Sequence, residues 1–208
     1  MLISICIASV RNHTLPHLVN SIIAQSYKNW ELIIAIQGEE PSLLAYVKQV
    51  AKLEPRVHFI QLQERGKNNA LNHAIAVAKG DLIAFTDDDC IAPPDWLATF
   101  ITCFQQERSV GIVAGNLVAA PAKPLQISAC PATYTIECIY RPAESGFAGP
   151  PGFYWSGGNY AVRHSVIDLV GPFDKYLGPG TAFPVGDDTD FALRAEQVGV
   201  VMWTTPPS

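Results

Sequence analysis

The sequence is poor in charged residues and contains no run of basic residues. Asp, Glu, Lys and Arg make up 16% of the 208 residues, and the formal net charge is −5. Nucleic-acid binding relies on clustered Lys and Arg, so the composition argues against a nucleic-acid partner. Hydrophobic residues make up 49% of the chain. This fraction is typical of a well-packed globular protein.

Cysteine is scarce, and its spacing is irregular. The chain has five cysteines, an odd number, and none of them form a Cys-x-x-Cys pair. The spacing therefore predicts neither a disulfide framework nor a zinc site, and reduced thiols fit a cytoplasmic protein. Long apolar runs of the ~20 residues needed to cross a membrane are also missing. The opening, MLISICIASV, reads as a first strand rather than a secretory leader. We expect a cytoplasmic protein, with contact at the inner face of a membrane left open.

Short apolar runs recur through the first half of the chain. They predict buried strands at residues 2–8, 31–36, 57–62 and 81–86. Amphipathic stretches between these runs predict helices, one capped by Ser42 and the next stopped by Gly80. Strands that alternate with helices indicate a parallel sheet covered by helices, which binds its ligands beyond the carboxyl ends of the strands.

The second half has weaker patterns. Residues 110–119 predict a strand, and residues 121–151, rich in Pro, Gly and aromatic residues, predict loops and short pieces. A strand that enters a short helix is expected from Asn159 onward. A further helix is expected to begin at the acidic residues after Gly186, followed by a last strand. Because no repeat or linker is visible, the two halves are expected to pack as one compact domain.

Three consecutive aspartates, Asp87, Asp88 and Asp89, directly follow the strand predicted at 81–86. Carboxylate oxygens in this position can hold Mg²⁺ or Mn²⁺, which usually share their coordination with the phosphates of a substrate. A cation would also offset the repulsion between the carboxylates. The alternative is a solvated, Asp-rich loop without a metal.

The stretch GKNNALNHAIAVAKGDLIAFTDDDCIAPPDWL resembles the core signature of family 2 glycosyltransferases. SIIAQSYKNWELIIA and WSGGNYAVRHSVIDLVGPFDKYLGPGTAFPVGDDTDFALRAEQVG are similar to further family motifs in the same order. The resemblance implies the GT-A fold, an α/β fold with a Rossmann-like, mostly parallel central sheet flanked by helices. It implies that residues 1–110 bind the donor and that residues 111–208 bind the acceptor and supply the catalytic base.

The resemblance also implies roles for individual residues. Asp87 and Asp89 match the metal-binding acids, and Asp87 also matches the acid that contacts the ribose. Asp88 lies between them in a supporting place at the nucleotide. Asp188 matches the general base, and Asp187 is its neighbour in the acidic pair. The remaining candidates for binding the nucleotide sugar are Ala8, Ser9, Asn12, Gln37, Lys67, Asn72, Gly157, Gly158 and Asn159.

The implied reaction is the metal-assisted transfer of a sugar from a nucleotide-diphosphate sugar to an acceptor hydroxyl, with inversion. The acceptor would be a saccharide or a lipid-linked molecule in glycan or polysaccharide synthesis. Two departures from the family stand out: Ile36 occupies the place of an acid that reads uracil, and no His follows His164 to bind metal. The alternatives are a non-catalytic module that binds a nucleotide or glycan and a sugar nucleotidyltransferase. The acids at 187–188 could also serve only the helix dipole.

Overall fold

The fold is built on a single eight-stranded sheet in the order β3-β2-β1-β4-β7-β5-β8-β6. The computed structural model describes residues 1–10, 13–119, 133–142 and 157–205. The strands are β1 (Ile3–Ser9), β2 (Trp30–Gln37), β3 (Val57–Leu62), β4 (Leu82–Thr86), β5 (Val110–Ala114), β6 (Cys138–Tyr140), β7 (Asn159–Arg163) and β8 (Val201–Thr204). Strands from both halves of the sequence therefore share one sheet.

The first four strands are parallel neighbours, as their continuous apolar runs predict. The second half mixes directions. β7 runs antiparallel to both β4 and β5, β8 runs parallel to β5, and β6 runs antiparallel to β8. Register decides what this does for the site, because Thr86 at the end of β4 pairs with Asn159 at the start of β7. The residues just after β4 and just before β7 are thereby brought to the same edge of the sheet.

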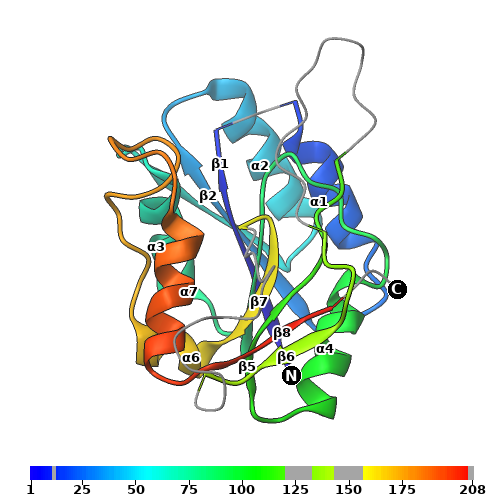
Figure 1. Cartoon of the computed structure of the whole chain (residues 1–208). Coiled ribbons are helices and arrows are strands. Elements are labelled where there is room, and N and C mark those ends of the chain that lie inside the picture. The colour runs from blue at the N-terminus through cyan, green and yellow to red at the C-terminus, as the bar shows by residue number, and fades with distance from the viewer. Residues whose placement is uncertain (11–12, 120–132, 143–156, 206–208) are drawn as a thin grey trace.

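Helices cover both faces of the sheet (Figure 1). They are α1 (Leu15–Ile23), α2 (Pro41–Leu53), α3 (Lys67–Val77), α4 (Trp96–Gln106), α6 (His164–Val170) and α7 (Asp187–Gln197). One core cluster joins α1, α2 and α4 to one face, and a second joins α3, α6 and α7 to the other. Alternate strand residues supply the two clusters: Ile5 lies in the first and Cys6 in the second. A strand buried on both faces must be apolar at every position, which explains the continuous runs.

The helix boundaries correct two sequence predictions. Ser42 does not cap α2. The cap is Glu40, whose carboxylate accepts a hydrogen bond from the Leu43 N–H at 2.8 Å, while the Ser42 hydroxyl donates to the same carboxylate. Gly80 does not end α3, which stops at Val77. Gly80 instead lies where the chain passes β1, and a Cβ there would be 2.5 Å from the Ser4 nitrogen.

The second half departs further from the sequence pattern. The strand expected over 110–119 ends at Ala114. β6 lies in the segment expected to contain loops and short pieces, and its three residues complete one edge of the sheet. Much of that segment, residues 120–132 and 143–156, lies outside the described residues.

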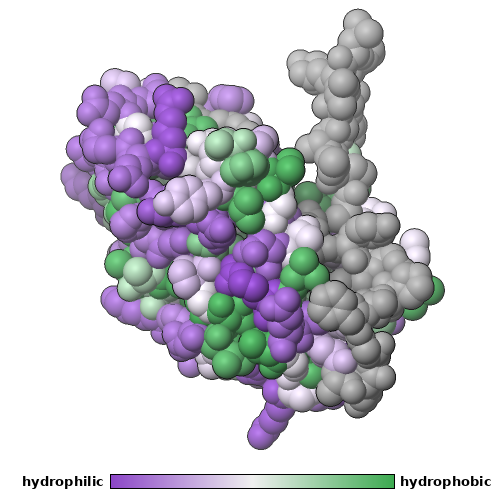
Figure 2. Space-filling model, turned by 60° about the vertical axis from the view of Figure 1, so that its left-hand side comes forward, coloured by the Kyte–Doolittle hydropathy of each residue, from purple (hydrophilic) through white to green (hydrophobic). Residues whose placement is uncertain are grey.

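The described surface is mixed in character. On the face shown in Figure 2, hydrophobic residues form small groups separated by hydrophilic ones. Among the helices that the structure describes, none combines the length and apolar character required to cross a membrane. The expected placement in the cytoplasm or at a membrane face stays a prediction.

Candidate functional site

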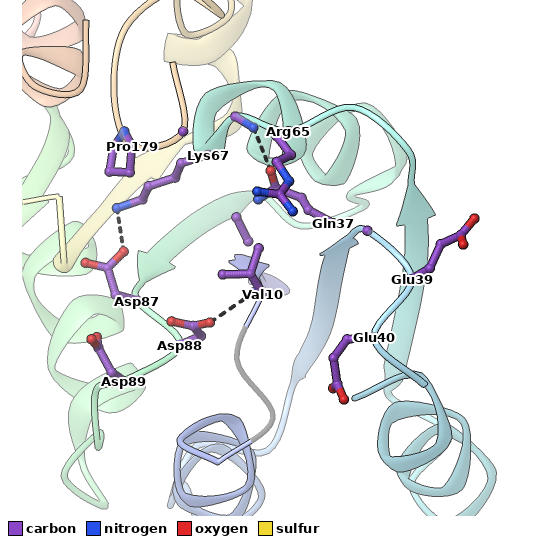
Figure 3. Close-up of a pocket in the computed structure, with 14 residues that line it drawn as sticks. Val10, Gln37, Glu39, Glu40, Arg65, Lys67, Asp87, Asp88, Asp89 and Pro179 are labelled. Carbon is purple, nitrogen blue, oxygen red and sulfur yellow. Dashed lines mark hydrogen bonds and ion pairs between the residues drawn. The ribbon is translucent and has the colours of Figure 1, made fainter. Parts of the chain in front are cut away.

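A cavity of about 650 Å³ opens beyond the carboxyl ends of β1, β2 and β4. This volume is in the usual range for a small-molecule site. Figure 3 shows the three aspartates on one side of the cavity and Gln37, Glu39 and Glu40 on the other. The lining residues are Ala8, Val10, Gln37, Gly38, Glu39, Glu40, Arg65, Gly66, Lys67, Asp87, Asp88, Asp89, Pro179 and Gly180. The cavity lies where a parallel α/β sheet places its ligands.

Asp88 fastens the triple aspartate to the first strand. It is 5% exposed, and its carboxylate accepts hydrogen bonds from the Ser9 hydroxyl at 2.8 Å and the Val10 N–H at 3.3 Å. These contacts make Asp88 and Ser9 a brace between the ends of β1 and β4. The supporting role at the nucleotide expected for Asp88 stays a prediction.

Asp87 is paired with Lys67, the first residue of α3 (Figure 3). Burial lowers the pKa of the Lys67 ammonium, but the carboxylates of Asp87, Asp187 and Asp188 outweigh burial and leave that pKa above its ordinary value. The ammonium is therefore a fixed positive charge in the cavity. A lysine at the start of a helix is well placed to meet an anionic ligand, because the helix dipole is positive there.

Two glycines connect the aspartates after β4 to the acids at the start of α7. The Gly157 N–H donates to Oδ2 of Asp188 at 2.8 Å, and a Cβ on Gly157 would lie 3.0 Å from that oxygen. A Cβ on Gly158 would lie 3.3 Å from Oδ2 of Asp87. The register of β4 and β7 therefore brings Asp87 and Asp188, 101 positions apart in the sequence, to opposite sides of one glycine pair.

The two neighbouring acids at the start of α7, Asp187 and Asp188, affect each other's environment, and the pKa of Asp187 is raised as a result. Burial, the charge of Asp188 and a hydrogen bond with that residue together raise the pKa of Asp187 to about 6. The helix begins directly after Gly186, whose backbone is in the left-handed conformation. No side chain caps the helix. Asp190, the third acid of this turn, is instead held by Arg194 at 2.7 Å. Asp187 and Asp188 are thus the two acids of this turn that are not paired with Arg194, and neither lines the cavity.

Gln37, and not Ile36, reaches the cavity from the end of β2. The Ile36 side chain is 1% exposed and lies in the core, whereas Gln37 lines the cavity. Oε1 of Gln37 accepts a hydrogen bond from the Gly66 N–H at 2.7 Å, which fixes which end of the amide is the oxygen. The donor end of the amide is then left for a ligand.

Two predicted ligand-binding residues have side chains occupied by the protein itself. Oδ1 of Asn159 accepts from the Trp96 indole at 2.7 Å, and its Nδ2 donates to the Asn116 carbonyl at 2.6 Å. Asn72 makes two hydrogen bonds to the backbone of Phe173. Neither residue lines the cavity, and for both of them the ligand-binding role stays a prediction. Asn12, the remaining candidate of the first loop, lies outside the described residues.

Sequence reasoning missed several residues of the cavity. Arg65 precedes the Gly66-Lys67 step, and its place next to a helix start would have been a usable signal for an anion contact. Glu39 and Glu40 follow β2 directly and could have been found from the strand-end rule. Pro179 and Gly180 carry no local signal, because they reach the cavity from a loop far along the chain.

The acids of the cavity suit a hard divalent cation whose coordination is completed by oxygen atoms of a bound ligand. Among the described residues, no group of three or more His, Cys, Asp or Glu could hold a metal by itself. Asp87 and Asp89 both line the cavity and offer carboxylate oxygens. Mg²⁺ and Mn²⁺ are commonly bound by one or two carboxylates together with substrate phosphates, so the residues present fit such an ion.

A family model for glycosyl transferase family 2 matches residues 4–167, most of the chain. The chain belongs to this family. The match confirms the resemblance seen in the motifs, and the mixed sheet with its flanking helices confirms the expected fold.

Individual relatives agree with the family. The chain is 26% identical over 108 residues to a glucosyl-dolichyl phosphate glucuronosyltransferase of Haloferax volcanii, covering 52% of this chain and 34% of the relative. The chain thus spans about a third of that protein.

Two solved structures share the fold. The structure of S. aureus TarS 1–349 with UDP-GlcNAc has a TM-score of 0.79 at 14% identity, covering 100% of this chain and 57% of that one. The mannosyltransferase PcManGT of Pyrobaculum calidifontis with GDP-Man and Mn²⁺ has a TM-score of 0.71 at 20% identity, covering 98% and 54%.

Proposed function

We propose that this domain transfers a sugar from a nucleotide-diphosphate sugar to an acceptor hydroxyl, with inversion at the anomeric carbon and with help from a divalent cation. The observation that carries the proposal is the placement of Asp87 and Asp188 on either side of the Gly157–Gly158 pair. One acid borders the cavity and the other lies just beyond it. A diphosphate bound at the first would place its sugar near the second.

Asp188 is the proposed general base. Its Oδ2 is held by the Gly157 N–H, and its carboxylate would receive the proton of an acceptor hydroxyl. A hydroxyl that loses its proton as it attacks is a stronger nucleophile, and this assistance typically contributes 10²- to 10⁴-fold in rate. Attack from the side opposite the departing diphosphate gives inversion.

The other end of the cavity is proposed to hold the departing diphosphate. Asp87 and Asp89 would bind the cation, which supplies charge compensation for the leaving group. Lys67 and Arg65 add positive charge to the same cavity. Asp88 and Ser9 keep the acids in place through the brace between β1 and β4.

The acceptor is proposed to be a saccharide or a lipid-linked saccharide. Relatives that support this class are the glucuronosyltransferase that acts on a dolichyl phosphate glucoside and a poly-β-1,6-N-acetyl-D-glucosamine synthase of Staphylococcus aureus. Both names point to glycan or polysaccharide synthesis. A place at the cytoplasmic side of a membrane is consistent with a lipid-linked acceptor.

The test is nucleoside diphosphate release from a panel of nucleotide sugars, UDP-GlcNAc and GDP-mannose among them, with saccharide acceptors and Mn²⁺. The anomeric configuration of the product is then read by NMR. We expect release that depends on an acceptor and a product of inverted configuration. Retained configuration would contradict the single displacement. A folded protein that binds no member of the panel would contradict donor binding altogether.

A further inference from the structure

The first two turns of α3 hold a segment from the far half of the chain. We call residues 173–180 the strap. Asn72 makes a two-way contact with Phe173: its Nδ2 donates to the Phe173 carbonyl at 2.8 Å, and the Phe173 N–H donates to its Oδ1 at 3.0 Å. Nδ2 of Asn68 donates to the Asp174 carbonyl at 2.8 Å. The backbone N–H of Lys67 donates to the Pro179 carbonyl at 2.9 Å.

The opposite side of the strap meets α7. The Phe173 ring lies 4.7 Å from the Phe191 ring of α7 and 5.4 Å from the Phe85 ring of β4, measured between ring centroids. Gly178 has a φ of +88°, and a Cβ there would lie 2.9 Å from the Asp187 carboxyl carbon. The strap is therefore packed between the helix that begins with Lys67 and the helix that begins with the acidic pair.

Asn72 fixes the strap specifically because both ends of its amide are used, whereas Asn68 contributes only its donor end. A strap without regular secondary structure needs partners for its backbone N–H and C=O groups, and Asn side chains supply them. Residues four apart lie on the same face of a helix, so Asn68 and Asn72 contact adjacent residues of the strap. Asn68 is fully buried, and loss of such a bond would leave a buried backbone group unsatisfied.

We propose that Asn72, assisted by Asn68, is a positioning residue that sets where Asp187 and Asp188 lie relative to the donor cavity. This role rests on the proposed function and replaces, for Asn72, contact with the nucleotide. α3 bears Lys67, which pairs with Asp87, so one helix is tied to both the donor end and the base end of the site. The strap carries that tie to α7.

The kinetic consequence is unequal. A base misplaced by about 1 Å can cost on the order of 100-fold in rate, because transfer needs the hydroxyl, the base and the donor in line. Nucleotide binding does not need the base. Loss of the Asn72 contacts should therefore lower kcat much more than it weakens binding of a nucleoside diphosphate.

Three variants separate the positioning role from general damage. Asn72→Ala removes both contacts with Phe173. Asn72→Asp keeps an acceptor for the Phe173 N–H but loses the donor to the Phe173 carbonyl. Asn69→Ala is the matched control, because Asn69 is on the same helix and its side chain reaches Glu64 at 3.4 Å rather than the strap. We expect kcat to fall at least tenfold in Asn72→Ala and less in Asn72→Asp, with UDP or GDP affinity within about twofold in Mn²⁺. Asn69→Ala should match the wild type.

Hydrogen exchange tests the positioning without any reliance on activity. In Asn72→Ala, peptides covering residues 173–190 should exchange faster than in the wild type, while peptides of α1 and β2 stay unchanged. Equal acceleration everywhere, or no acceleration at 173–190, would overturn the positioning role. So would an equal loss of kcat and nucleotide affinity. A wild type that neither binds nucleotide nor transfers sugar overturns the proposed function, and the exchange pattern then decides the strap by itself.

Discussion

The two acidic groups of this molecule, at 87–89 and at 187–188, deal with the repulsion between neighbouring carboxylates in different ways. Asp87 has Lys67 as a counter-charge, and Asp88 has the Ser9 hydroxyl and the Val10 N–H. At the start of α7, burial and Asp188 instead raise the pKa of Asp187 to about 6. In the first group a lysine ammonium and hydroxyl and backbone donors offset the charge, whereas in the second the pKa of one carboxyl is raised by burial and by its neighbour. The difference fits a binding role for the first group and a proton-handling role for the second.

The sharpest way to break this comparison is Asp188→Asn. The amide can still accept the hydrogen bond from the Gly157 N–H through its oxygen, but it cannot take a proton. We expect transfer to fall by about 10²- to 10⁴-fold, while calorimetric affinity for a nucleoside diphosphate with Mn²⁺ stays near that of the wild type.

Asp187→Asn is the companion variant, and we expect a milder loss from it. Transfer that survives in Asp188→Asn but is lost in Asp187→Asn would give the base role to the other member of the pair. Activity in both variants would make the acids of α7 structural and would end the proposed mechanism.

The binding role of the first group predicts a metal effect on nucleotide affinity. We expect a chelator to weaken binding of UDP or GDP by about 10- to 100-fold, and Asp89→Ala to lower affinity in Mn²⁺ to the same level. Asp95→Ala is the control, since Asp95 is an exposed acid nearby whose side chain caps nothing. Equal affinity with and without chelator, measured by calorimetry, would remove the cation from donor binding.

The raised pKa of Asp187 predicts a pH effect on stability. The pKa of Asp187 is raised from 3.8 to about 6, so the folded state holds this proton more tightly than the unfolded state. The stabilisation is complete below about pH 3.8 and is lost as the pH rises through about 6. The loss is at most about 3 kcal/mol, from a pKa that rises from 3.8 to about 6 and about 1.4 kcal/mol per pKa unit, because solvent screens part of the charge.

Urea unfolding of the wild type and Asp187→Asn at several pH values isolates this contribution. As the pH rises from 4.5 to 7, the free energy of unfolding of the variant should increase relative to that of the wild type, because only the wild type loses the Asp187 contribution. Asp95→Asn, which changes an exposed acid, should show no such trend. A difference between wild type and Asp187→Asn that does not vary with pH would show that the pKa of Asp187 is not raised in the folded protein.

Local patterns in the sequence predicted the features with local causes. Continuous apolar runs predicted the parallel strands, and the strand-end rule placed Asp87, Asp88 and Asp89 at a cavity. These predictions depend on neighbouring residues and on one general property of parallel sheets. The family motifs added the acids of α7, which the register of β4 and β7 then brought near Asp87.

Features with distant partners could not be predicted in this way. The partner of Asn72 is a backbone group 101 positions away, and that of Trp96 is Asn159, 63 positions away. The three residues of β6 are too few for a periodic pattern. Ser42 was predicted as the cap of α2, but the carboxylate of Glu40, two positions earlier, caps the helix.

The smallest expected effect concerns Gln37, at the end of the cavity away from the aspartates. Its oxygen is held by the Gly66 N–H at 2.7 Å, so the amide offers a ligand its donor end, where an acid would offer an acceptor. Ile36, at the family's base-reading position, is buried. We therefore expect uracil to be read weakly or differently here, through a base carbonyl or ring nitrogen. One such hydrogen bond is worth about 0.5–1.5 kcal/mol, so Gln37→Ala should weaken binding of the favoured nucleotide about 2- to 12-fold.

Gln37→Glu is the matched variant, because it keeps an acceptor for Gly66 and loses both donors. Competition by UDP, GDP, CDP and TDP against one fluorescent donor analogue measures the selectivity of each protein. A UDP preference lost in both variants would show that the amide donor reads the base. A preference lost in Gln37→Ala but kept in Gln37→Glu would assign Gln37 to holding Gly66 alone. A strong UDP preference insensitive to both would mean that β2 does not read the base and that the motif alignment at Ile36 is wrong.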